Sequence, residues 1–258
     1  MSTRWHIGAK HLRGAIAAYA KRFDLLEVRA ARSAQAPAAG SPDRTGADGA
    51  PGPSIATMRR WRKSVPPHFD FAVVAGPHLS RVKTSDVVDQ EIEAAIAAID
   101  ALQARCFVLR TPPDVTPTSL WRDRIGKIIA RIPHDVTHFV WEPSGVWEMP
   151  DAAAQAREWG VVLALDPSRE MVPSGPIAYL RLRGLGETQS FSPIALERIV
   201  NAVGARRDAF VIIETDTAQT EAKRLRQLSR KSRPETVGGA ARLIRPRGDI
   251  IVRDDEQE

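Results

Sequence analysis

Eight short runs of strand-forming residues recur along the chain, and helical patterns separate most of them. The runs are Trp5–Ile7, Leu25–Val28, Phe69–Val74, Cys106–Leu109, His138–Trp141, Val161–Leu165, Ile177–Leu182 and Phe210–Ile213. Helices are expected at about 11–23, 54–65, 87–102, 119–131, 150–159, 192–205 and 218–228, where apolar residues recur at i, i+3 and i+4. One such segment, IEAAIAAIDAL, aligns Ile92, Ile96 and Ile99 on one face.

Strands that alternate with helices favour a parallel sheet, and eight repeats in about 225 residues predict a closed (β/α)8 barrel of the TIM type. An open, doubly wound sheet is the alternative. Such a sheet normally begins with a glycine-rich first turn, and IGAKHLRG is a poor match to GxGxxG. We therefore expect one barrel over residues 1–228.

Two segments fall outside this rhythm. Residues 34–53 are mostly Ala, Gly and Pro, without branched aliphatic or aromatic side chains. Such a composition cannot offset the entropy of ordering, so we expect a disordered insertion after the second strand. A flexible lid is the functional interpretation of this loop, and an expanded low-complexity loop is the simpler one. Residues 229–258 are expected to form a mobile charged tail, with a possible short hairpin at 243–252.

Charge and composition limit the classes of function. The net charge is +6, which permits polyanionic partners, but the basic residues are dispersed over predicted helices, so nucleic-acid binding is possible and not favoured. The chain has no run of about 18 apolar residues that could span a membrane. Its N-terminus lacks the apolar centre of a signal peptide. The single cysteine, Cys106, cannot form an internal disulfide, which fits a cytoplasmic location.

The stretch YLRLRG at 179–184 indicates where polar groups gather. Leu180 and Leu182 alternate with Tyr179, Arg181 and Arg183, so the leucines should face the helices and the other three the lumen. Catalytic groups of such barrels lie at the carboxyl ends of the strands. The same alternation predicts a ring of mixed charge at this end, made by Glu27, Arg29, Arg110, Glu142, Asp166, Arg181, Arg183, Glu214 and Asp216.

Two interpretations of this ring remain open. The acids and arginines could neutralise one another, because charges at a barrel mouth need partners. Alternatively, the arginines could hold an anion, since a guanidinium matches carboxylate and phosphate geometry, with nearby carboxylates as acid and base. Trp147, on the loop after the fifth strand, is a candidate to stack on a ligand. Cys106 is expected to lie deep in the lumen, where a thiol is normally inert.

A metal site is disfavoured. His6, near the end of the first strand, is the one histidine expected close to the mouth. The arginines of the ring would oppose a cation, and too few ligand types converge there. We expect no metal and no cofactor.

Several motifs resemble the YecE-like family, also called domain of unknown function 72, over roughly residues 5–228. They are FDLLEV (23–28), PSIATMRRWRKSVPPHFDFAV (53–73), TPP (111–113), YLRLRG (179–184) and FVIIETD (210–216). The resemblance implies a TIM-type barrel and carries no settled reaction. It also implies that Glu27 and Asp166 match the family pattern. Arginine replaces the family's Asn, His, Gln and His at four polar positions, namely Arg29, Arg81, Arg110 and Arg183.

These replacements point to a divergent member that keeps the scaffold. Arginine is almost always charged and is a poor proton shuttle, so the changes favour binding of an anionic small molecule, or of a protein partner, without family-type catalysis. An enzyme acting on a small phosphorylated or carboxylated substrate is the alternative, and a nucleic-acid-binding protein is a third. If there is catalysis, the expected residues are Glu27, Asp166 and Glu214. The expected ligand-binding residues are Arg29, Arg110, Glu142, Trp147, Tyr179, Arg181 and Arg183.

Overall fold

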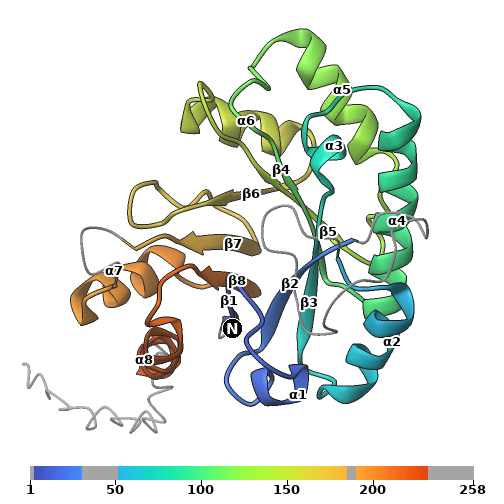
Figure 1. Ribbon diagram of the computed structural model, residues 1–258. Coiled ribbons are helices and arrows are strands. Elements are labelled where there is room, and N and C mark those ends of the chain that lie inside the picture. Colours follow the sequence, from blue (N-terminus) through green and yellow to red (C-terminus); the bar gives the residue numbers. More distant parts are fainter. Residues whose placement is uncertain (1–2, 31–51, 185–189, 232–258) are drawn as a thin grey trace, which may run out of the picture.

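The computed structural model describes residues 3–30, 52–184 and 190–231. Within them, parallel strands form a closed barrel in sequence order, and helices surround it (Figure 1). The strands are β1 (Arg4–Ala9), β2 (Leu25–Arg29), β3 (Asp70–Val74), β4 (Cys106–Arg110), β5 (His138–Glu142), β6 (Val162–Leu165), β7 (Ile177–Leu182) and β8 (Asp208–Ile213). The predicted (β/α)8 barrel is confirmed, and the open sheet is excluded because β8 pairs with β1 from Arg4↔Asp208 to Ala9↔Ile213.

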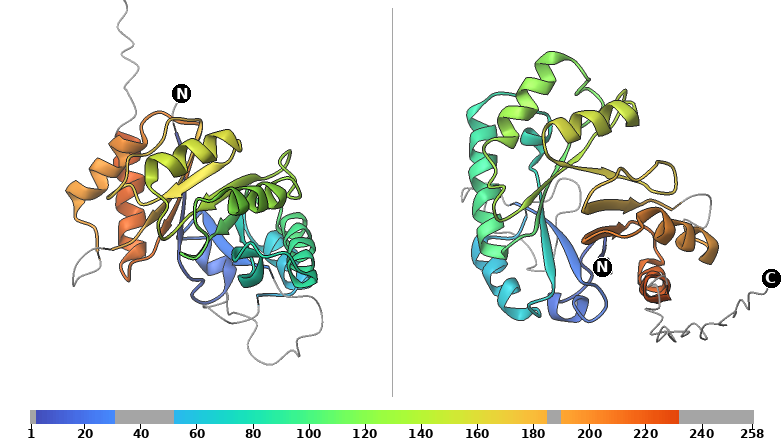
Figure 2. Two further views of the ribbon diagram at one scale, coloured as in Figure 1. Left: turned by 90° about the horizontal axis from the view of Figure 1, so that it is seen from above. Right: turned by 180° about the vertical axis from the view of Figure 1, so that it is seen from behind.

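The helices largely follow the predicted periodicity. They are α1 (Ile16–Tyr19), α2 (Ile55–Ser64), α3 (Pro77–Ser80), α4 (Asp86–Leu102), α5 (Ser119–Ile129), α6 (Met149–Glu158), α7 (Pro193–Val203) and α8 (Ala218–Lys231). Ser54 and Ser192 cap α2 and α7, where each side chain accepts a hydrogen bond from the third residue of the helix. The chain passes from β6 to β7 without a helix in between, which leaves an interval between α6 and α7 (Figure 2).

Three details of the helices differ from the prediction. Helix α1 is a single turn instead of the expected 11–23. The short α3 was not predicted, because four residues carry no periodic signal. In α4 the isoleucine alignment is partly wrong, since Ile96 is 37% exposed whereas Ala95 and Ala98 are fully buried. Small side chains let α4 lie close to the barrel on that face.

Two apolar clusters make up the core, one on each side of the barrel wall. Leu180 and Leu182 belong to the outer cluster between strands and helices. Tyr179 and Cys106 belong to the inner cluster, which fills the lumen. The predicted alternation along β7 is therefore confirmed. Each fully buried leucine stabilises the fold by about 1.5–3 kcal/mol relative to an exposed one.

The predictions for the insertion and for the C-terminal tail fall mostly on residues outside those that the structure describes. Most of the insertion at 34–53, and the tail from 232 with its possible hairpin at 243–252, lie outside the described residues. Helix α8 continues to Lys231, three residues past the boundary expected for the barrel. Among the described helices, none is long and apolar enough to cross a membrane.

Candidate functional site

Arg181 lies at the centre of the charged ring and is 1% exposed. Alternation along β7 turns its side chain into the lumen, where it contacts three carboxylates, two from strands β2 and β5 and one from the residue that follows β8. Its Nη2 and Nη1 donate to Glu27 at 2.6 and 3.1 Å. Its Nε donates to Glu142 at 2.9 Å, and Nη1 also donates to Glu214 at 2.9 Å. The guanidinium is thus enclosed by carboxylates, as the first interpretation of the ring expects.

Two further arginines lie above this layer, toward solvent. Arg183 donates to Glu142 and lies 3.7 Å from Glu214, and its side chain is 44% exposed. Arg110 at the end of β4 contacts Glu142 at 3.2 Å, and its side chain is 40% exposed. Glu142 therefore interacts with three guanidinium groups while two of them remain open to solvent.

A pocket of about 320 Å³ opens at this level of the barrel mouth. Its cationic lining consists of four arginines, Arg29, Arg81, Arg110 and Arg183. Glu142 is the one carboxylate among its lining residues in the described part of the chain. Pro112 and Pro143 contribute apolar wall. The pocket thus presents an excess of positive charge, as the second interpretation of the ring, an anion held by the arginines, requires.

The protonation states in the buried layer follow from its contacts. Burial opposes ionisation of Glu27, but the charge and hydrogen bonds of Arg181 and the hydrogen bond from Tyr179 outweigh it, so the pKa of Glu27 is lowered. Burial, with the charge of Glu27, raises the pKa of Tyr179 well above its usual value. The Tyr179 phenol therefore stays protonated and donates to Glu27 at 2.6 Å. Glu27 is a held carboxylate and a poor proton donor near neutral pH.

Asp166 and Asp216 differ from the other predicted acids in position. Asp166 follows β6 and is 6% exposed. It accepts hydrogen bonds from the backbone and side chain of Ser168, and one oxygen lies 3.4 Å from the backbone nitrogen of Arg183. It fixes the loop beside the mouth. The side chain of Asp216 is 89% exposed and contacts Arg13 at 3.7 Å, so its predicted place in the ring is wrong.

Trp147 does not lie on the mouth pocket, which corrects the prediction that it stacks on a ligand. It is 6% exposed. Its ring packs edge-on against Trp141 with centroids 4.7 Å apart, and its Nε1 donates to the Val115 carbonyl at 2.7 Å. Trp147 therefore has a structural role: its ring is buried in the outer core, and its indole N–H donates a hydrogen bond to a loop carbonyl.

His6 lies at the opposite end of the barrel from the mouth, contrary to expectation. β1 extends to Ala9, two residues beyond its predicted end, so His6 sits in the lower half of the strand. Its ring nitrogens contact Asp70 at 2.5 Å and Asp208 at 3.0 Å. In the described residues no group of three or more His, Cys, Asp or Glu side chains could hold a metal ion.

Glu91 is a buried acid that the sequence reasoning missed. It projects from α4 onto α3, where it accepts from the Leu79 amide at 2.6 Å and contacts His78 Nδ1 at 2.9 Å. Helix α3 precedes Arg81, so Glu91 holds the turn that carries one wall of the pocket. The sequence did contain a signal for it, because Glu91 lies next to the buried Ile92 on the apolar face of an amphipathic helix.

Comparison with known proteins agrees with this architecture. The model of the family "Protein of unknown function DUF72" matches residues 52–244. The search of curated proteins found no match. A DUF72 family protein from Enterococcus faecalis superposes with a TM-score of 0.64 at 13% identity, covering 88% of this chain and 96% of that one.

Two further solved structures are similar in fold. A DUF72 family protein from Thermotoga maritima gives a TM-score of 0.61 at 13% identity, with 88% of this chain and 98% of that one covered. A xylose isomerase domain containing protein from Salmonella typhimurium gives 0.57 at 17% identity, covering 88% and 95%. At these identities the likeness shows the fold alone.

Proposed function

We propose, from the premise that the chain belongs to the DUF72 family of proteins of unknown function, that its barrel mouth binds a small anionic ligand without acid–base catalysis. The family brings no reaction with it, so the proposal rests on the site. The ligand class is a compact phosphate or carboxylate. A protein partner that presents such a group is included in that class.

The observation that carries the proposal is the unequal charge of the mouth pocket. Four arginines line it against one carboxylate. Arg110 and Arg183 share that carboxylate, Glu142, and keep about two fifths of their side chains exposed. The Arg81 side chain has no ion-pair partner among the described residues. Guanidinium forks bind phosphate and carboxylate oxygens in pairs, so a ligand anion would complete their hydrogen bonding.

The groups at the barrel mouth and in the buried layer beneath it argue against acid–base catalysis. Glu27 accepts from Arg181 and Tyr179, and its lowered pKa makes it a weak base. No histidine is among the described residues that line the mouth pocket. An arginine does not exchange its proton near neutral pH. A base poised near the operating pH, which such catalysis needs, is not supplied by these groups.

Titration calorimetry with inorganic phosphate at low ionic strength tests the proposal. We expect binding by the parent, and roughly tenfold weaker binding by Arg81→Gln, since that change removes one charged donor and breaks no ion pair. Arg198→Gln, at an exposed position on α7, is the matched control and should bind like the parent. Equal phosphate affinity in all three proteins, or no binding by the parent, would refute the proposal.

Salt and nucleic acid give a second test. Ligand binding at an exposed arginine pocket should weaken as ionic strength rises. If instead the protein binds DNA or RNA with a steep salt slope and does not bind phosphate, the basic helices are the functional surface.

A cytoplasmic location is part of the proposal, because Cys106 is a free, buried thiol that no disulfide constrains.

A further inference from the structure

A second cavity, of about 400 Å³, lies at the opposite end of the barrel from the mouth pocket. It opens between β5, β6, β7 and α6, beside the helix-free loop from β6 to β7. β6 meets β7 only at Ala164↔Tyr179 and Leu165↔Leu180, and it meets β5 only at Val140↔Val162 and Trp141↔Leu163. The first residues of β5 and β7 are therefore not paired with β6, and the cavity opens there.

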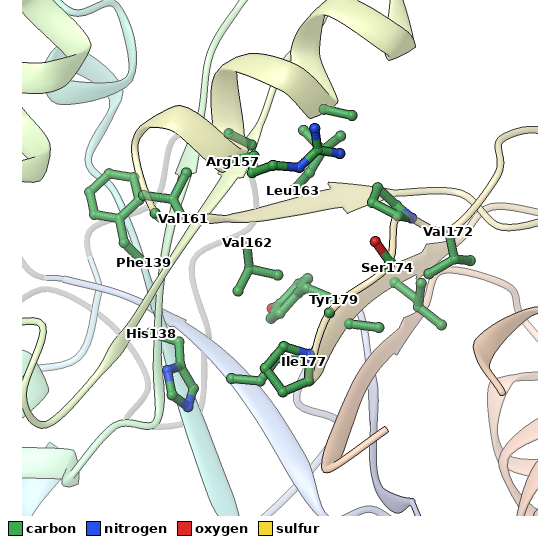
Figure 3. A pocket seen from close by; sticks show the side chains of 18 of the residues that line it. His138, Phe139, Arg157, Val161, Val162, Leu163, Val172, Ser174, Ile177 and Tyr179 are labelled. Carbon is green, nitrogen blue, oxygen red and sulfur yellow. The ribbon is translucent and has the colours of Figure 1, made fainter. Parts of the chain in front are cut away.

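The walls of the cavity are mainly apolar, and they come from both cores. Val161 and Val172 pack against the outer cluster. Val162 and Ile177 pack against the inner cluster, next to Tyr179. All five are partly or fully buried and surround the space in Figure 3. An apolar group seated here would bridge the outer core and the lumen at the thinnest part of the wall.

Polar groups without partners stand at the edges of this apolar space. The Thr137 hydroxyl is buried and has no hydrogen-bond partner. The side chains of Arg157 and Ser174 lie at one end of the cavity in Figure 3; both residues are solvent-exposed, and among the described residues neither side chain has a hydrogen bond or ion pair. No aspartate or glutamate is among the described lining residues, whereas Arg157 and two histidines are. Buried hydroxyls are normally hydrogen-bonded, so the Thr137 hydroxyl is available to a water or to a ligand atom in this cavity.

We propose that this cavity is a binding site for a small amphipathic carboxylate. The apolar body would lie against Val162, Ile177 and Tyr179, and the carboxylate would pair with Arg157 and Ser174. Small-molecule sites have this make-up, mostly apolar with a few polar groups that fix orientation, and volumes of about 300–1,000 Å³. The inference does not depend on the mouth pocket, whose lining shares no residue with this cavity.

Calorimetry of the full chain with octanoate and with its neutral analogue octanamide tests the site. We expect one octanoate per chain. Arg157→Gln should weaken octanoate binding roughly tenfold, the scale of one charge-assisted hydrogen bond, and should leave octanamide binding within about twofold. Ala153→Trp, which fills the cavity from α6, should abolish binding of both. Ala154→Trp, at the neighbouring exposed position outside the lining, is the matched control.

Two readouts keep the result decisive. In the parent, octanoate should shift the methyl NMR resonances of Val162 and Ile177, whatever the stability of Ala153→Trp. Saturating inorganic phosphate, which would occupy the mouth pocket, should leave octanoate affinity unchanged, and this separates the two sites. The proposal is overturned if octanoate leaves those methyl resonances unchanged, or if Arg157→Gln and Arg198→Gln weaken octanoate binding equally.

Discussion

The Glu27 carboxylate accepts hydrogen bonds from both terminal nitrogens of Arg181, at 2.6 Å from Nη2 and 3.1 Å from Nη1. Because Glu142 and Glu214 also contact this guanidinium, Arg181 is the shared counterion of three carboxylates. From the sequence Arg181 was expected to bind ligand. With 1% exposure its place is beneath the mouth pocket, and its role is to hold the acids that would otherwise repel one another.

Arg181→Met should lower the free energy of unfolding by roughly 3–5 kcal/mol, the cost of leaving buried carboxylates without their counterion. Urea unfolding at pH 7 measures it. Burial favours a neutral Arg181, but Glu27 and Glu142 raise its pKa well above the usual value, so the charge is present in the folded protein. Adding Glu27→Gln to Arg181→Met should recover part of the loss. A change below 1 kcal/mol would show that the layer is not stabilised by this pair.

Arg183→Gln, in the solvent-exposed layer above Arg181, should change phosphate affinity without a large change in the free energy of unfolding. Its side chain is 44% exposed, so solvent screens its contacts with Glu142 and Glu214. We expect phosphate affinity to fall roughly tenfold and the free energy of unfolding to change by less than about 1 kcal/mol. Calorimetry and urea unfolding of the same preparation check both. Unchanged affinity with a large loss of stability would make Arg183 a structural partner only.

The fold could be predicted from the sequence because strand and helix periods are local properties. Side chains alternate strictly along a strand, so the period-2 pattern of YLRLRG also placed Leu180 outside the lumen and Arg181 inside it. The positions of Trp147 and His6 could not be predicted. Trp147 lies on a loop and packs against Trp141 of β5, and His6 contacts Asp208, which lies 202 residues later in the chain. Such contacts depend on register and loop path, which no local pattern encodes.

Gly76→Ala tests the support of the Arg81 wall. A Cβ at Gly76 would lie 2.4 Å from the Glu91 carboxylate, which caps α3. The clash should displace Glu91, lower the free energy of unfolding by about 1–3 kcal/mol and weaken phosphate binding. Gly126→Ala is the control, because its nearest neighbour, the indole nitrogen of Trp159, lies 4.0 Å away. In helix α5 that change should stabilise by about 0.5–1 kcal/mol. Equal stability of the two variants would contradict the clash.

The acid stability of the barrel should depend on Asp208, at the end opposite the mouth. Burial favours its neutral form, but hydrogen bonds from His6, Arg4 and Arg207 and the charge of Arg105 outweigh this and lower its pKa from 3.8 to about 2. The folded state therefore holds this proton more weakly than the unfolded state. The resulting stabilisation is present above about pH 4 and is lost as the pH falls toward 2.

Asp208→Asn should consequently destabilise the protein by ~2 kcal/mol at pH 7, the value of a pKa shift of this size. The difference from the parent should shrink as the pH is lowered from about 4 to about 2, because the parent then loses the same charge by protonation. Urea unfolding across this range measures both free energies. Asp216→Asn, at a side chain that is 89% exposed, is the control and should follow the parent at every pH. A difference between Asp208→Asn and the parent that stays constant with pH would mean that packing, and not the ionised carboxylate, stabilises this end of the barrel.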